Sequence, residues 1–177
     1  MVIELPISKS LANRLLILQA IHGDGLMTVS ACGVTDDARV VGCFDLPEDV
    51  QILHRALTTL HHSTQRYTTL NLSNCGTAMR FLTAYAAQLE NKVTVLDGVE
   101  RMHHRPIGQL VDALREIGAD IEYLGEEGFP PLRIKGCILD KHRIVTLDHP
   151  QSTQFVSALL LIGANVQTNS TSPYITL

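Results

Sequence analysis

A strand-like segment of this chain runs directly into a helix-like segment around residue 75. Residues 67–70 are β-branched and aromatic, which favours a strand, and residues 78–89 are rich in Ala and Leu, which favours a helix. Between them lies a polar turn with one glycine, and Thr77 stands where a helix N-cap is expected. Free N–H groups and the positive end of the helix dipole suit such a junction to binding anions. Taken alone, the pattern more often marks an ordinary capped turn.

The same kind of junction occurs at two more places. Residues 3–10 combine a strand-like run with Ser, Lys and Ser, and an apolar helix is expected at 11–21. Residues 144–154 combine a strand-like run with Gln, Ser, Thr and Gln before an expected helix at 155–162. Three helix N-termini brought to one face would form a binding site for a polyanion.

The order of the predicted elements repeats along the chain. In the middle of the chain we expect strands at 67–70, 93–96, 119–124 and 132–135. Helices are expected at 78–89 and from Pro106, at its first position, to an end at Gly118. The same order starts near residue 2 and again near residue 144. We therefore expect an α/β fold of repeated β-α-β-α-β-β units at about 1–66, 67–136 and 137–177, with helices packed inward and the last unit incomplete. A further amphipathic helix is expected after the acidic segment 45–49.

Composition limits the classes of function. A formal net charge of −4 and a pI near 6.0 argue against nucleic acid as the main partner. The longest apolar stretch, residues 11–21, contains Asn, Arg and Gln and is too short to span a bilayer. The chain enters a strand pattern at its first residues, so we expect no signal peptide and a cytoplasmic location.

Neither the cysteines nor the paired histidines predict a metal centre. The four cysteines are Cys32, Cys43, Cys75 and Cys137, and none has the spacing of a zinc site, so we expect reduced thiols. Cys75 lies in the polar turn, but no base stands beside it to activate a nucleophile. The histidines form two adjacent pairs, His61–His62 and His103–His104. Side chains of adjacent residues point in different directions in a strand or a helix, so neither pair is expected to share a metal ion.

Five short motifs follow one another in a fixed order. They are LPISKSLANR at 5–14, NCGTAMR at 74–80, RMHHRPIG at 101–108, STQF at 152–155 and SPY at 172–174. They resemble the L-P-G-S-K-S-x-S-N-R, N-A-G-T-A-M-R, R-M-x-x-R-P-I-G, S-S-Q-F and S-x-P-Y segments of the 5-enolpyruvylshikimate-3-phosphate synthase family. The sister family, which transfers enolpyruvate to a UDP-sugar, lacks the S-K-S-x-x-N-R pattern.

This resemblance implies a transferase of the shikimate pathway, which leads to chorismate and the aromatic amino acids. The family transfers the carboxyvinyl group of phosphoenolpyruvate to the 5-hydroxyl of shikimate 3-phosphate, without a metal or an organic cofactor. The resemblance also implies an enolpyruvyl transferase fold, which is an inside-out α/β prism. It further implies a cytoplasmic enzyme that is monomeric at full length. Carried over by position, the residues contacting phosphoenolpyruvate would be Lys9, Gly76, Arg105 and Gln154. Those contacting shikimate 3-phosphate would be Lys9, Ser10, Arg14, Ser152, Thr153, Gln154 and Tyr174.

The chain departs from the family pattern in sequence and in length. Ile7 replaces a glycine, Phe81 replaces a proline, and Thr153 replaces a serine. Family members are more than twice as long, and their second domain supplies the carboxylates that transfer protons. We therefore expect this chain to be most of one domain of a two-domain enzyme, inactive alone. The alternatives are a module that binds a phosphorylated ligand without turnover, a repeat domain with no ligand, and the related UDP-sugar transferase.

Overall fold

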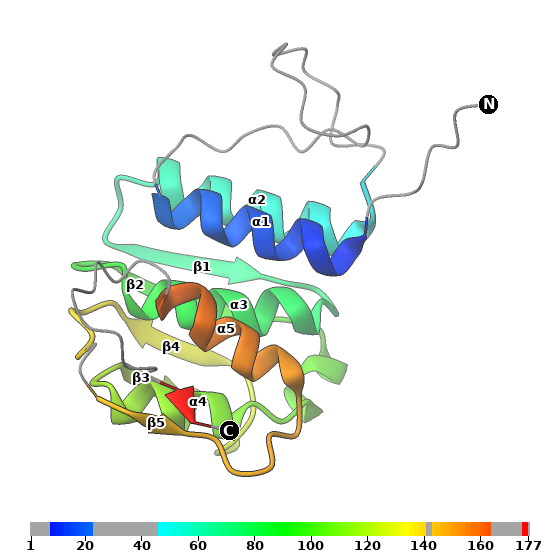
Figure 1. Cartoon of the computed structure of the whole chain (residues 1–177). Helices are drawn as coiled ribbons and strands as arrows, with labels where there is room; N and C mark the ends of the chain where they lie inside the picture. Colours follow the sequence, from blue (N-terminus) through cyan, green and yellow to red (C-terminus); the bar gives the residue numbers. More distant parts are fainter. Residues whose placement is uncertain (1–7, 23–45, 141–142, 164–174, 177) are drawn as a thin grey trace.

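The computed structural model describes residues 8–22, 46–140, 143–163 and 175–176. Figure 1 shows a sheet with helices packed against one side of it. The strand-like run expected just before the Ser-Lys-Ser segment, together with Tyr174, lies outside the described residues. No helix among the described residues is long and apolar enough to cross a membrane.

A four-stranded sheet forms the centre of the described structure. Its strands are β1 (Tyr67–Asn71), β2 (Val93–Asp97), β3 (Asp120–Tyr123) and β4 (Leu132–Lys135), in the spatial order β1-β2-β4-β3. β1 and β2 are parallel, and β4 is antiparallel to both of its neighbours. The connections from β1 to β2 and from β2 to β3 are the helices α3 (Gly76–Ala87) and α4 (Gly108–Glu116). The β-α-β-α-β-β order predicted for residues 67–136 is thereby confirmed.

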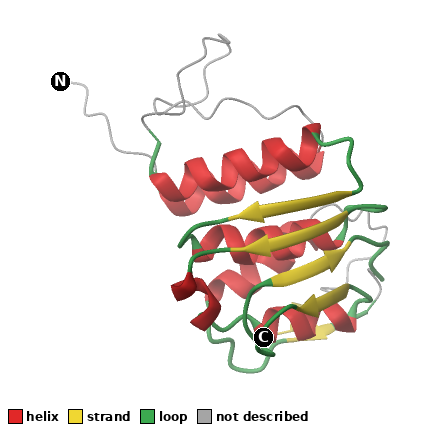
Figure 2. Cartoon of the chain, turned by 180° about the vertical axis from the view of Figure 1, so that it is seen from behind, coloured by secondary structure: helices red, strands yellow, loops and turns green. Residues whose placement is uncertain are grey.

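The register of the sheet separates an apolar face from a charged face. Leu70, Leu96 and Leu132 are paired across three strands and are all buried. The opposite face carries the cross-strand ion pairs Arg133–Glu122 and Lys135–Asp120. Because side chains alternate along a strand, one row packs on the helices while the other faces solvent. Figure 2 shows the strands from this second side, with helices behind them and a further helix beyond the edge of the sheet.

Helix α3 is the central helix of the fold. It contacts α1 (Lys9–His22), α2 (Glu48–His62) and α5 (Thr153–Gly163) as well as the strands β2 and β4. Most of its side chains are buried, and this all-round burial is typical of a helix that is apolar on every face. The helices predicted at 11–21, after 45–49 and at 155–162 are confirmed as α1, α2 and α5.

Two predictions about helix starts are wrong. α3 begins at Gly76, so its N-cap is Cys75, whose sulfur accepts a hydrogen bond from the Ala78 N–H at 3.4 Å. The Thr77 hydroxyl instead contacts Gln154 of α5. Pro106 does not open α4, which begins at Gly108 with Ile107 as its N-cap.

The reason for the second error lies in the loop that precedes α4. Ile107 has a φ of −136°, outside the α-helical range, and its N–H donates to the Gly128 carbonyl at 2.9 Å. The segment just before it, Glu100–His104, forms a short 3₁₀ helix, η2.

The last described elements begin a further strand–helix sequence. β5 (Val145–Thr146) pairs in parallel with β6 (Ile175–Thr176), and α5 lies between them in the chain. The predicted strand at 144–148 is therefore present, although shorter. The division of the whole chain into three repeats at 1–66, 67–136 and 137–177 stays a prediction.

Candidate anion-binding site

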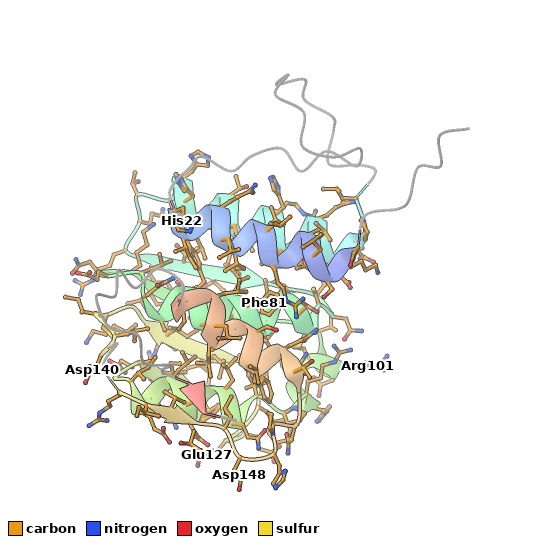
Figure 3. All side chains as sticks on the ribbon, viewed as in Figure 1. His22, Phe81, Arg101, Glu127, Asp140 and Asp148 are labelled. Atoms are coloured by element: carbon orange, nitrogen blue, oxygen red, sulfur yellow. The ribbon has the colours of Figure 1, made fainter. Side chains whose placement is uncertain are left out.

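The first two turns of α1, α3 and α5 lie close together. Arg14 of α1 contacts Phe81 of α3 and Ser157 of α5, and Gln154 of α5 contacts the first turn of α3. In Figure 1 the three helices begin on the same side of the molecule, at the right of the view. Figure 3 labels Phe81 between the helices and Arg101 at that same side. Three polar junctions that are far apart in the sequence thus meet in space.

Gln154 connects the start of α5 to the start of α3. Its Nε2 donates to the Thr77 hydroxyl at 3.0 Å, and its Oε1 accepts from Arg80 Nη1 at 2.9 Å. Its backbone N–H donates to the Ser152 hydroxyl at 3.2 Å, so Ser152 satisfies one of the free donors at the start of α5. The side-chain amide of Gln154 therefore has partners at both ends.

Gly76 lies beneath two guanidinium groups. A Cβ atom at Gly76 would lie 2.6 Å from Arg105 Nη1 and 2.9 Å from Arg80 Nη1. A small pocket is lined by Gly76, Arg80, Arg105, Met79, Met102, Pro106 and Ile107. Neither guanidinium has an ion-pair partner among the described residues. Two positively charged side chains lie next to a glycine at the start of a helix, and this environment favours the binding of an anion.

The electrostatics of Arg80 reflect this crowding. Burial lowers the pKa of the Arg80 guanidinium, and the nearby charge of Arg105 lowers that pKa further. The Arg80 Nε atom is buried and has no hydrogen-bond partner in the described part of the chain. A partly buried cation beside a like charge is an unfavourable arrangement unless an anion offsets it.

Arg14 and Ser10 form a second polar group at the start of α1. Arg14 Nη1 donates to the Ser10 carbonyl at 2.8 Å and also contacts the Ser10 hydroxyl. Its Nη2 donates to the Ser157 hydroxyl at 2.8 Å, and its guanidinium lies 5.6 Å from the centre of the Phe81 ring. These contacts fix the guanidinium where α1, α3 and α5 meet.

Lys9 is held at the edge of the site by an acidic residue of α2. Its Nζ lies 3.7 Å from the Asp49 carboxylate, and both side chains are largely exposed. The Asp49 carbonyl in turn accepts from the Cys75 thiol at 3.7 Å, directly before Gly76. Thr153 is exposed at the start of α5, and Tyr174 lies outside the described residues.

Four residues at this site are not predicted from the sequence to bind a ligand: Thr77, Arg80, Ser157 and Asp49. Thr77 is predicted there only as a helix cap. One signal could have identified Arg80, because it is the one charged residue within the apolar helix α3. Asp49 and Ser157 carry no such signal, since their roles come from contacts between helices.

Cys75 has a structural role at this junction. The Cys75 thiol is buried, and burial raises its pKa, so less of it is the reactive thiolate at neutral pH. This agrees with the sequence argument against a nucleophilic role. Among the described residues, no group of three or more His, Cys, Asp or Glu side chains could hold a metal ion.

Comparison with known proteins identifies the family. The model of the EPSP synthase (3-phosphoshikimate 1-carboxyvinyltransferase) family matches residues 2–174. The chain belongs to the EPSP synthase family. It is 42% identical over 163 residues to the 3-phosphoshikimate 1-carboxyvinyltransferase of Bacteroides fragilis strain YCH46, an overlap of 91% of this chain and 34% of that protein. It is 41% identical over 165 residues to that of Bordetella pertussis strain Tohama I, covering 90% of this chain and 37% of the relative.

The fold agrees with a solved EPSP synthase. The structure of the enzyme from Acinetobacter baumannii superposes with a TM-score of 0.63 at 24% identity, covering 91% of this chain and 38% of that one. This likeness shows the mixed α/β fold of part of an EPSP synthase. The chain spans about a third of the length of the curated relatives it matches.

Proposed function

We propose that this chain is part of an enzyme that transfers the carboxyvinyl group of phosphoenolpyruvate to shikimate 3-phosphate, and that it forms one face of the binding site. The observation that supports this most is the position of the Arg105 guanidinium over Gly76, with Arg80 beside it. Phosphoenolpyruvate carries a phosphate and a carboxylate side by side, and a guanidinium group suits such a ligand.

The two substrates are assigned to neighbouring parts of this face. Phosphoenolpyruvate is assigned to Lys9, Gly76, Arg105 and Gln154. Shikimate 3-phosphate is assigned to Lys9, Ser10, Arg14, Ser152, Thr153, Gln154 and Tyr174. The Ser10–Arg14–Ser157 contacts support the second group, because they fix one guanidinium beside two hydroxyls. The hydrogen bonds of the Gln154 side chain with Thr77 and Arg80 support the assignment of Gln154 to both ligands.

The reaction requires proton transfers that the described residues do not supply. The 5-hydroxyl gives up its proton as its oxygen bonds to C2 of phosphoenolpyruvate, and C3 takes up a proton. C3 then loses a proton as the C2–O bond to phosphate breaks, which releases inorganic phosphate. Both steps need a positioned acid or base. In the described part of the chain, the carboxylate that contacts an assigned residue is Asp49, and it is paired with Lys9.

The chain alone is therefore expected to bind its ligands weakly and not to turn them over. Enclosing and aligning two reactants can lower a barrier by roughly 7–11 kcal/mol, and one open face does not enclose them. Charge contacts on an exposed face contribute about 1 kcal/mol or less each. We expect an affinity for shikimate 3-phosphate no better than about the millimolar range.

A titration followed by NMR tests this function. The 177-residue chain, labelled with ¹⁵N, is titrated with each substrate, and phosphate release is assayed with both present. We expect saturable shifts at the starts of α3 and α5, weaker binding in Arg105→Gln, and unchanged binding in the control Arg101→Gln, which alters an exposed arginine of η2. Equal losses in the two variants would contradict the assignment. Turnover near that of a full-length synthase would contradict the inactivity of the chain.

One alternative is a module that binds a phosphorylated ligand without catalysis. The coverage of about a third of the relatives' length leaves this alternative open to experiment. A native reading frame that continues into a second domain favours the enzyme, whereas a frame that ends here favours the module. The absence of any saturable binding would favour a repeat domain without a ligand. The family model favours the shikimate enzyme over the UDP-sugar transferase. We further propose a cytoplasmic protein, monomeric at full length, that needs no cofactor.

A further inference from the structure

Arg80 holds the side chain of Gln154 from the neighbouring helix. It is the one charged residue of α3, and its guanidinium lies 5.5 Å from the centre of the Phe155 ring, next to Gln154 in the chain. Its Nη1 donates to Gln154 Oε1 at 2.9 Å across a separation of 74 residues. The guanidinium is therefore packed on one side and hydrogen-bonded in its own plane.

These contacts fix which way the Gln154 amide faces. A guanidinium has donors and no acceptor, so only the amide oxygen can point toward Arg80. The amide nitrogen then points to the Thr77 hydroxyl, which accepts from it at 3.0 Å. Reversing the amide would place its NH₂ group against the Arg80 donors, which is unfavourable.

We propose that Arg80 is a positioning residue that orders the Gln154 side-chain amide beside the anion site at Gly76 and Arg105. The choice of phosphoenolpyruvate as the ligand of that site rests on the proposed function. The ordering of Gln154 is independent of it.

Two other roles for Arg80 predict different behaviour. If Arg80 acted only by its charge, Arg80→Lys would retain its effect, because lysine keeps the charge but not the planar fork of donors. If Arg80 acted only by packing on Phe155, its replacement would change the stability of the protein and leave ligand binding unchanged. A positioning role predicts loss of order at Gln154 and coupling between the two residues.

The first experiment measures the order of the Gln154 side chain without any ligand. ¹⁵N relaxation of Nε2, assigned by comparison with Gln154→Ala, is recorded for the wild-type chain, Arg80→Lys and Arg80→Met. We expect a rigid group in the wild type and an order parameter below about 0.6 in both variants. Equal order in all three proteins would overturn the proposal. Arg115→Lys is the matched control, because Arg115 also lies over an aromatic ring, Tyr123, and donates to the backbone away from this site.

The second experiment measures coupling through phosphoenolpyruvate binding. Arg80→Lys is expected to weaken binding by about 10-fold or more in the wild-type background, as for loss of a hydrogen bond to a charged group. In the Gln154→Ala background the same change is expected to alter binding less than about 2-fold. If Arg80→Lys weakens phosphoenolpyruvate binding by the same factor in the wild-type and Gln154→Ala backgrounds, the proposal is overturned.

The two experiments separate this proposal from the proposed function. If the wild-type chain does not bind phosphoenolpyruvate, the function fails, and the relaxation data still decide whether Arg80 orders Gln154. If Arg80→Met does not fold, Arg80→Lys provides the measurement.

Discussion

Arg14 donates a hydrogen bond from Nη2 to the hydroxyl of Ser157, which lies 2.8 Å away and 143 residues later in the chain. This bond joins the second turn of α1 to the second turn of α5, beside the Phe81 ring of α3. The guanidinium that we assign to shikimate 3-phosphate is thus oriented by a residue outside the recognised motifs.

Ser157→Ala should weaken binding of shikimate 3-phosphate by a few-fold and leave phosphoenolpyruvate binding unchanged. Loss of a hydrogen bond to a charged group changes free energies by about 1.5–3 kcal/mol, and ligand binding senses only part of this because Arg14 keeps its bond to the Ser10 carbonyl. Titration by NMR measures both affinities. The control is Thr59→Ala, which removes a hydroxyl bonded within α2. Equal effects on the two ligands would contradict the separate assignment of Arg14.

Gly76→Ala should fold nearly as well as the wild type but lose affinity for phosphoenolpyruvate. The new Cβ would meet the ends of the flexible side chains of Arg105 and Arg80, which can move aside, so the cost to folding is small. The displaced Arg105 guanidinium would no longer face the ligand. Affinity for shikimate 3-phosphate should fall less. In a full-length enzyme, inhibitors that occupy the phosphoenolpyruvate site, as glyphosate does in this family, should lose more.

Thermal unfolding and titration of the same variant check both parts of that prediction. Gly163→Ala serves as the control, because a Cβ there would meet no atom within 4 Å. A large drop in the unfolding temperature, or equal losses for the two substrates, would contradict the placement of Gly76.

Gly136→Ala should destabilise the fold by about 1–3 kcal/mol or more, as expected when a side chain is forced against fixed atoms. A Cβ at Gly136 would overlap the backbone carbonyl of Leu89, which unlike a side chain cannot rotate away. Denaturant unfolding measures the loss. Gly125→Ala is the matched control, since its Cβ would lie 3.5 Å from Pro131 Cδ, an ordinary contact. Similar stability of the two variants would show that the chain near Gly136 adjusts.

Cys75 should react more slowly than Cys137 with iodoacetamide at neutral pH. The Cys75 thiol is buried and its pKa is raised by that burial, whereas Cys137 is partly exposed. Mass spectrometry of peptides from the folded chain gives the rate for each site. Rapid alkylation of Cys75 would indicate that the start of α3 opens readily.

Stability should fall as the pH is lowered through about 6.5, the ordinary pKa of histidine, in part because of His54. Burial lowers the pKa of His54 in the folded state, so the unfolded chain binds the proton more readily. The loss develops between the unfolded and folded pKa values, and it is absent at higher pH. His54→Gln should reduce the pH dependence of the unfolding temperature in this range. An unchanged slope would exclude His54 as a source.

The sequence predicts the elements of residues 67–136 well because their signals are local. The alternation in β3 and β4 and the apolar spacing in α4 need only neighbouring residues, and each corresponds to an observed element. The motifs likewise predict Lys9, Arg105 and Gln154 as candidates for binding anions, since residue type and order suffice for that.

The caps and the contacts between helices depend on tertiary packing. Thr77 has the local pattern of an N-cap, yet its hydroxyl bonds Gln154, and the Cys75 sulfur caps α3 instead. The hydrogen bond from Arg80 to Gln154 spans 74 residues, so no local pattern encodes it. A side chain's partner is determined by which helices pack together, and packing depends on burial of apolar surface along the whole chain.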